Sequence, residues 1–336
     1  MFRTLAVLCS ITALFLPSSA SAWNPSGHKV VGSIADQLLN ANAKYEVAQI
    51  LGFDLSTAGP WLDCVKSVEK QADGSFVYKE DPRFEPPCVP FKLERVRMED
   101  YAKRNWFDCS YVTGGKDRGC HNTYHFDDVA IQRDRFDRNF EGTNDHDLVG
   151  AINAAIAVLL DRPAPPPFSI IDKKEALFML AHLVGDLHQP LHVGAVYLDG
   201  KGQLVDPDVT HTIDPNTETA GANVIFDQGT NFHFEWDTIP SDLGEVATPE
   251  LLASARSEPG DRGRIENWSV AWATDTILAA QQAFSEVKFA RAPNDKGWTI
   301  SFTDPDGYLR SADTLKRRQL AKAGARLAAL LNFIWP

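Results

Sequence analysis

The segment most informative about the fold runs from residue 176 to residue 192 and reads Ala176-Leu-Phe-Met-Leu-Ala-His182-Leu-Val-Gly-Asp186-Leu-His-Gln-Pro190-Leu-His192. Its apolar first part predicts a buried helix, which Pro190 ends. Four residues separate His182 from Asp186, so both side chains leave the same helix face one turn apart. The chain after the break brings His192 back toward that face. The segment therefore predicts a metal-binding face on a core helix.

The same chemistry recurs elsewhere in the chain. In His233-Phe-Glu-Trp-Asp237 an imidazole and a carboxylate again lie one helical turn apart. Tyr124-His125-Phe126-Asp127-Asp128 adds another imidazole beside carboxylates, and Asp63 shares a predicted helix face with Lys66. One such pair is more often a hydrogen-bonded pair than a ligand pair, but the repetition indicates a site for several metal ions. Four histidines have no comparable neighbours, and they are His121, His146, His188 and His211.

Residues 1–22 predict a signal peptide. Arg3 precedes an apolar run that is too short for a membrane span, and Ala20-Ser-Ala22 fits a cleavage site. Cleavage would make Trp23 the N-terminal residue, and its freed α-amine, with a pKa of about 7.7 to 8.0, could bind a metal ion together with His28. We therefore expect an exported protein, periplasmic or secreted, whose working domain is residues 23–336.

The composition is acidic and globular. The net charge is −12, and loss of residues 1–22 removes Arg3 as the only charged group, which makes it −13. Such a surface argues against tight, sequence-independent binding of duplex nucleic acid, which needs Lys and Arg to neutralise phosphates. The 44% hydrophobic content favours a single domain, and no segment is long and apolar enough to span a membrane.

Apolar residues at helical spacing dominate the chain, and alternating patterns typical of strands are scarce, so we expect an all-α fold. Connections rich in Pro and Gly separate the predicted helices. The helical patterns lie at 30–39, 148–160, 176–187, 265–284 and 315–334. The connections lie at 72–89, 162–168, 199–222 and 292–307.

Four cysteines remain after export, Cys64, Cys88, Cys109 and Cys120, and an even number in an exported chain predicts two disulfides. Pairing of near neighbours, Cys64 with Cys88 and Cys109 with Cys120, is favoured, although three connectivities are open. The alternative is a zinc site with four thiolates. None of the spacings is the Cys-x-x-Cys of such sites.

Taken in order, the motifs Trp-x4-His, Trp-x-Asp, His-Phe-x-Asp, His-x3-Asp-x5-His and His-x3-Asp resemble those of the S1/P1 nuclease family of exported, zinc-dependent, single-strand-specific nucleases. The resemblance extends from Trp23 to the last predicted helix. It implies a mostly helical domain of the type shared with zinc-dependent phospholipases C. It also implies three Zn²⁺ ions at the base of a cleft.

The resemblance further implies how nine residues share these ions. One zinc would be held by Asp63, His125, His182 and Asp186. Its close neighbour would be held by the Trp23 amine and carbonyl, by His28 and by Asp186, which bridges the pair. The third would be held by His192, His233 and Asp237.

The implied activity is endonucleolytic hydrolysis of single-stranded DNA and RNA to 5′-phosphate products, together with hydrolysis of 3′-nucleotides. Zinc lowers the pKa of bound water to about 7 and stabilises the attacking and leaving oxygens. Asp63 would orient the nucleophile, and Lys66 would lie near the substrate phosphate. The resemblance implies that Phe126 stacks on a nucleobase, while Asp128 and Asn223 contact its polar edge. No stable protein partner is implied, and a monomer is expected.

Two other functions are open. A zinc-dependent phospholipase C would share the fold and most ligands, but that group has Glu in place of Asp237 and a longer spacing from its terminal Trp to its first His. A non-catalytic exported protein could use zinc only to hold its fold together. The stretches 63–125 and 192–233 are longer than the resemblance leads us to expect, so the family's disulfides and its second base-binding details are not carried over to this sequence.

Overall fold

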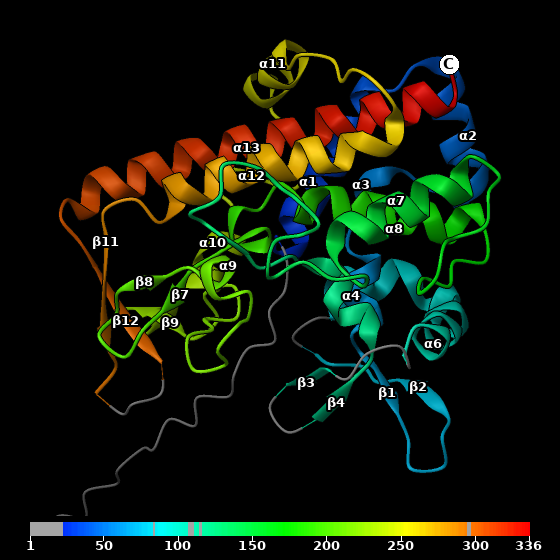
Figure 1. Cartoon of the computed structure of the whole chain (residues 1–336). Helices are drawn as coiled ribbons and strands as arrows, with labels where there is room; N and C mark the ends of the chain where they lie inside the picture. The colour runs from blue at the N-terminus through cyan, green and yellow to red at the C-terminus, as the bar shows by residue number, and fades with distance from the viewer. Residues whose placement is uncertain (1–22, 83–84, 107–110, 114–115, 294–296) are drawn as a thin grey trace, which may run out of the picture.

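The computed structural model describes residues 23–82, 85–106, 111–113, 116–293 and 297–336, and Figure 1 shows their arrangement. The predicted signal peptide, residues 1–22, and Cys109 lie outside the described residues. None of the described helices is both long and apolar enough to cross a membrane.

Helices form the body of the protein, with α8 (Lys173–Asp186) at its centre. Every residue of α8 from Glu175 to Asp186 is buried, because α7 (Leu148–Leu159), α1 (Pro25–Leu38) and α13 (Pro305–Ile334) pack around it. The remaining α-helices are α2 (Ala41–Leu51), α3 (Leu55–Ala58), α4 (Trp61–Val65), α5 (Glu85–Cys88), α6 (Arg95–Arg104), α9 (Pro207–Thr210), α10 (Phe232–Asp237), α11 (Pro249–Ser257) and α12 (Trp268–Ala283). Short 3₁₀ helices are η1 (Val89–Glu94), η2 (Cys120–His125), η3 (Pro190–His192) and η4 (Ile265–Asn267). The five predicted helical segments are confirmed, since they correspond to α1, α7, α8, α12 with the short helix before it, and α13.

Acidic and amide side chains fix where the main helices begin. Asp172 accepts a hydrogen bond from the Glu175 amide at the start of α8, over 2.9 Å. Asp147 does the same for Gly150 in α7. Such caps satisfy backbone N–H groups that have no partner within the helix. The register of α8, and with it the direction of its two candidate ligands, is therefore set from its first turn.

The fold is mostly helical, as expected, but it is not purely α-helical, because short strands pair outside the predicted helices. A four-stranded sheet has the order β10-β9-β12-β11, with β9 and β12 parallel and the other pairs antiparallel. Figure 1 places this sheet and the hairpins β1-β2 and β3-β4 at opposite sides below the helices. Most of these strands are too short for alternation to stand out in the sequence. The strands are β1 (Val68–Lys70), β2 (Phe76–Tyr78), β3 (Tyr111–Thr113), β4 (Lys116–Arg118), β5 (Val129–Ala130), β6 (Gly194–Ala195), β7 (Tyr197–Leu198), β8 (Leu204–Val205), β9 (Ile225–Asp227), β10 (Thr230–Asn231), β11 (Val287–Arg291) and β12 (Trp298–Phe302).

One disulfide links Cys64 in α4 to Cys88 in α5, which confirms the first predicted pair. Cys120 is also disulfide-bonded, whereas its predicted partner Cys109 is outside the described residues. A zinc site built from four thiolates is therefore excluded, since three of the four sulfurs are oxidised. The Cys64–Cys88 bond anchors α4 at the residue next to Asp63.

Candidate metal centre

The centre begins with His182 and Asp186 on α8, which are completely buried. The Nδ1 atom of His182 lies 2.8 Å from the Gly59 carbonyl oxygen, so this nitrogen is the donor and carries the proton. Its Nε2 atom then presents a lone pair and lies 3.2 Å from Asp186 Oδ2. The predicted pairing across one helical turn is confirmed.

Three residues from other elements surround this pair, and we call the five side chains together the paired cluster. His125, at the end of η2, has Nδ1 2.9 Å from Asp186 Oδ2. His28, in the first turn of α1, has Nε2 3.4 Å from Asp186 Oδ1. Asp63, in α4, has Oδ1 3.7 Å from His182 Nε2. Four separate elements thus converge on Asp186 and His182.

The close packing of α1 on α8 depends on Gly185. The His28 ring stacks on that of His182 with 3.7 Å between ring centroids and 17° between planes. A Cβ atom at Gly185 would lie only 2.9 Å from His28 Nδ1. Glycine is therefore required next to Asp186 for His28 to reach the cluster.

A second group, which we call the trio, consists of His192 in η3 with His233 and Asp237 in α10. The two Nε2 atoms lie 3.1 Å apart, and Asp237 lies 3.7 Å from His192 and 3.5 Å from His233. The Nδ1 atom of His192 donates to the His125 carbonyl over 2.7 Å, and that of His233 donates to the Gly221 carbonyl over 2.5 Å. Both Nε2 lone pairs therefore point to the centre of the trio, as metal-binding histidines require.

Burial keeps the imidazoles neutral. It lowers the pKa of His28 to about 3 and that of His182 to about 4, and the neighbouring positive charges contribute further. Metal ions bind the neutral ring, so no proton has to leave these histidines near neutral pH.

The carboxyl groups behave in the opposite way. Burial raises the pKa of Asp186 to about 7 and that of Asp237 to about 7, because a buried carboxylate is costly without a nearby cation. Burial also acts to raise the pKa of Asp63, but Lys66 and the neighbouring histidines outweigh it, so the net pKa is lower than usual. Lys66 Nζ lies 2.7 Å from Asp63 Oδ1, which confirms that the two share one face.

The donor atoms fit divalent zinc. Three groups of three ligand atoms lie within 4.8 Å of one another, and imidazole nitrogens with carboxylate oxygens are its usual ligands. Among the described residues, both ring nitrogens of His28, His125 Nε2 and Asp186 Oδ1 are buried without a hydrogen-bond partner. Buried polar atoms rarely remain so. The groups are His28 with Asp63 and His182, His125 with His182 and Asp186, and the trio.

The N-terminal segment of the domain is held between both groups. The buried Trp23 indole donates to the Gly185 carbonyl over 2.9 Å, next to Asp186. The Asn24 amide donates to the Asp237 carbonyl over 2.8 Å. The backbone that follows the predicted cleavage site is thus fixed beside the ligands of both groups.

Comparison with known protein families matches residues 23–335 to the family described as S1/P1 Nuclease. The chain belongs to the S1/P1 nuclease family. Endonuclease 2 of Arabidopsis thaliana is 26% identical over 98% of this chain and 96% of its own length. Nuclease S1 of Aspergillus oryzae is 24% identical over 97% of this chain and 96% of its own length. Membership of this family indicates a nuclease, which is a hydrolase.

The candidate substrate residues of this S1/P1 nuclease lie near the ligands along the chain. Phe126 follows His125 directly and is half-buried. Burial raises the pKa of Asp128 to about 7, with a contribution from Glu218. The Asn223 side chain donates to the Ala220 carbonyl over 2.8 Å. Their contact with a nucleobase stays a prediction.

No pattern in the sequence indicated two residues that support the ligands. Buried Gln189 donates from Nε2 to Asp237 Oδ1 over 2.6 Å, which orients that carboxyl group. Lys316, on α13, donates to the carbonyls of Glu235 and Thr238 over 2.6 and 2.8 Å and so holds the end of α10. Only the position of Gln189 between two histidines could have drawn attention to it.

His188 lies outside the centre, as predicted. Its Nδ1 atom donates to the Val184 carbonyl over 2.7 Å, and its Nε2 atom accepts from Arg326 over 2.8 Å. One ring nitrogen therefore bonds back to α8, and the other links the end of α8 to α13.

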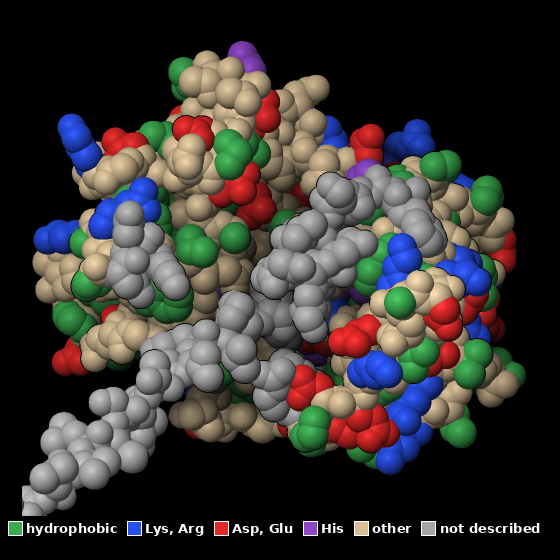
Figure 2. Space-filling model, turned by 90° about the horizontal axis from the view of Figure 1, so that it is seen from below, with side chains coloured by type: hydrophobic (Ala, Val, Ile, Leu, Met, Phe, Trp, Pro, Cys, Tyr) green, Lys and Arg blue, Asp and Glu red, His purple; other side chains and the backbone are tan. Residues whose placement is uncertain are grey.

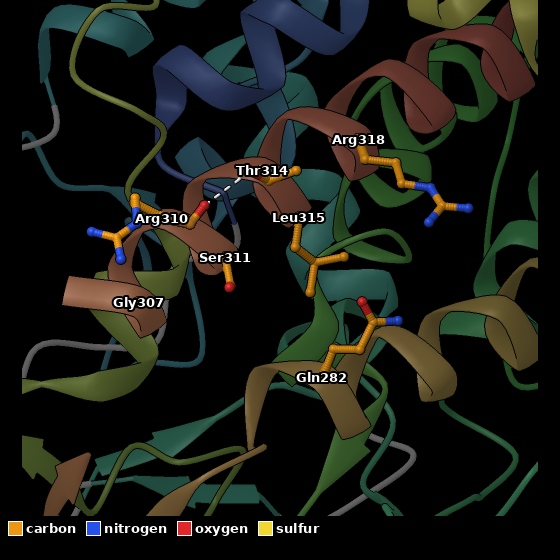
Figure 3. Close-up of a pocket in the computed structure, with 7 residues that line it drawn as sticks. All are labelled: Gln282, Gly307, Arg310, Ser311, Thr314, Leu315 and Arg318. Atoms are coloured by element: carbon orange, nitrogen blue, oxygen red, sulfur yellow. Dashed lines mark hydrogen bonds between the residues drawn. The ribbon is translucent and has the colours of Figure 1, made fainter. Parts of the chain in front are cut away.

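A surface groove between α12 and α13 is also separate from the centre (Figure 3). It is lined by Gln282, Leu315 and polar side chains of α13, and none of its lining residues is a candidate ligand. Arg310 and Arg318 point to its two ends (Figure 3). The cleft expected over the metal ligands is thus a different feature and stays a prediction.

Proposed function

We propose that this S1/P1 nuclease hydrolyses single-stranded DNA and RNA endonucleolytically to 5′-phosphate products, with zinc as cofactor, and also hydrolyses 3′-nucleotides. The observation that carries the proposal is the convergence of eight His and Asp side chains into the paired cluster and the trio, only a few ångströms apart within each group. The family match, which begins at Trp23, supports it.

Nine residues would hold three zinc ions. Asp63, His125, His182 and Asp186 would hold one, and the Trp23 amine and carbonyl with His28 and Asp186 would hold its neighbour. The trio would hold the third. Zinc supplies a nucleophile near neutral pH and positive charge around the phosphoryl oxygens of the substrate.

The residues of the chain position these parts. Asp63 is ionised beside Lys66 and so can accept a hydrogen bond from the attacking water and orient it. Lys66 Nζ can donate to a phosphoryl oxygen as well as to Asp63. Gln189 and the carbonyls behind His182 and His233 keep the ligands from rotating, which reduces reorganisation during the reaction.

Selection of single strands would come from contact with an accessible base. Figure 2 shows positive and negative side chains interspersed on the side that carries α6 and β1-β2, rather than gathered into one basic tract. Binding would therefore depend on the cations and on stacking, which is worth about 1–3 kcal/mol per base. Phe126 would provide the ring, and Asp128 and Asn223 the polar contacts. A base paired in a duplex cannot reach them.

Export would complete the centre. Removal of residues 1–22 frees the Trp23 amine at a place already fixed by the Trp23 indole and the Asn24 amide. The second disulfide, between Cys109 and Cys120, would also form in an oxidising compartment. We propose a periplasmic or secreted enzyme that acts as a monomer.

The test is an assay of purified residues 23–336 on single-stranded DNA, duplex DNA, RNA and a 3′-nucleotide, with His182→Ala as the inactive variant and His146→Ala as the matched control. We expect zinc-dependent cleavage of single strands that His182→Ala loses and His146→Ala keeps. Hydrolysis of phosphatidylcholine without DNA cleavage would instead identify a phospholipase C. If chelation unfolds a protein that had no activity beforehand, the zinc only holds the fold together.

A further inference from the structure

A second aromatic side chain stands beside the metal ligands. Phe234 follows His233 in α10, just as Phe126 follows His125 at the end of η2. Its side chain is 52% exposed, and within the described residues its ring stacks on no other ring and lies under no cation. An aromatic ring that is half exposed and unpartnered loses hydrophobic stabilisation that burial would give it.

The position of Phe234 on α10 places it on the open flank of the trio. Side chains leave a helix about 100° apart, so Phe234 lies to one side of His233, while Trp236 lies to the other side of Asp237. Trp236 is 1% exposed and closes its flank against the core. Phe234, at 52% exposure, therefore lies on the flank of α10 that remains open to solvent.

The ring is presented on a rigid element. Asn231 caps α10 by accepting from the Phe234 amide over 2.9 Å, and its own amide donates to the Asn223 carbonyl over 2.7 Å. At the other end of α10, Lys316 donates to Glu235 and Thr238. A ring carried on a fixed backbone loses less conformational entropy when a ligand stacks on it than a ring on a mobile loop.

The surroundings favour a base rather than a phosphate. The acidic residue Glu235 lies next to Phe234 in the chain, and Asp227 of β9 lies close to Glu235. These acids would repel a phosphate group. A neutral, planar nucleobase has a π-face that can stack on the ring whatever its sequence.

We propose that Phe234 is a second stacking site for a nucleobase, on the opposite side of the scissile phosphate from Phe126. A phosphodiester joins two nucleosides, so a phosphate bound between the paired cluster and the trio would have one nucleoside near each group. The histidine before Phe126 belongs to the paired cluster, and the histidine before Phe234 belongs to the trio. A 3′-nucleotide has only the nucleoside that Phe126 would take, so it does not use Phe234. This inference rests on the proposed function.

The test compares KM and kcat of four proteins on an oligothymidylate and on a 3′-nucleotide. They are the wild type, Phe234→Leu, Phe234→Trp and the control Phe333→Leu, whose side chain is 54% exposed on α13. We expect Phe234→Leu to raise KM for the oligonucleotide about tenfold, because stacking is lost, with hydrolysis of the 3′-nucleotide and zinc content unchanged. Phe234→Trp and Phe333→Leu should behave like the wild type.

The outcomes separate the two proposals. A wild type that is inactive on both substrates defeats the proposed function, and the stacking site with it. An active wild type whose KM is unaffected by Phe234→Leu overturns the stacking site alone. Equal losses on both substrates, or a loss of zinc, also overturn it, because they show a structural role for Phe234.

Discussion

The paired cluster and the trio are built from the same residue types but are held in different ways. In the trio, each histidine donates from Nδ1 to a backbone carbonyl, and Asp237 accepts from Gln189. In the paired cluster, both ring nitrogens of His28 and one oxygen of Asp186 are buried without a hydrogen-bond partner in the described part of the chain. Protein hydrogen bonds therefore orient all three ligands of the trio, whereas we expect bound cations to supply the missing partners of the paired cluster.

The largest effect is expected from Asp186→Asn. This change removes the carboxylate on which His28, His125 and His182 converge, and we expect activity to fall by about a thousandfold or more, since several kcal/mol of charge stabilisation are lost. Zinc analysis should show loss of the two ions of the paired cluster and retention of the third. Asp134→Asn, at a side chain 83% exposed, is the control. Full activity of Asp186→Asn would contradict the inference that the paired cluster, unlike the trio, needs cations to hold its ligands together.

A smaller loss is expected from one extra residue ahead of Trp23. The extension replaces the α-amine by an amide, which is a poor metal ligand, while the Trp23 indole contact to Gly185 can persist. We expect about a hundredfold lower activity and one zinc fewer, because even partners outside the ligand shell are worth about 10–100-fold. The control is the protein that begins at Trp23, assayed for activity and zinc content in the same way. An extended form with full activity would refute the amine as a ligand.

Gln189→Ala tests the trio from outside its ligands. Loss of the hydrogen bond to Asp237 should weaken the third zinc by about tenfold or more, since outer partners orient the ligand. Titration with a competing chelator measures this affinity. Gln71→Ala, which removes a side-chain amide that donates to the Glu69 carbonyl in the exposed β1-β2 hairpin, should leave this affinity unchanged. Weakening of the paired cluster instead would show that the two groups are not separable.

The smallest effect concerns pH in the zinc-free protein. The pKa of Asp237 is raised to about 7 in the folded chain, so folding favours its protonated form. The stability that the proton contributes is complete below the unfolded pKa of about 3.9 and is lost as the pH rises to about 7. Asp237→Asn keeps the neutral form at every pH.

The stability of the wild type relative to Asp237→Asn should therefore fall between about pH 4 and pH 7, by about 1 kcal/mol per pH unit. Both proteins have the same histidines, so the difference isolates the carboxyl group. Thermal unfolding of chelated protein across this range measures it. If the difference in stability between the two proteins does not vary with pH, burial does not raise the pKa of Asp237 in the folded chain.

The helical body and the ligand pairs could both be predicted from the sequence, because both depend on the 3.6-residue period of a helix. His182 and Asp186 share a helix face through local geometry alone, and the same holds for His233 and Asp237. The predicted signal cleavage pointed to Trp23 and His28, and the family resemblance linked them to Asp186 of α8, which no local pattern does. The four-stranded sheet was missed, because β9 and β12 pair in parallel from segments far apart in the chain.

By itself, the sequence determined which side chains can bind metal ions, because the spacing of ligands on a helix depends only on its pitch. Tertiary structure alone decided which atoms of these side chains face the centres of the two groups. The carbonyls of Gly59 and Gly221 fix the Nδ1 protons of His182 and His233, and Gln189 turns Asp237. Gly59 is 123 residues from His182 in the chain and Gly221 is 12 residues from His233, and such hydrogen bonds leave no periodic pattern in a sequence.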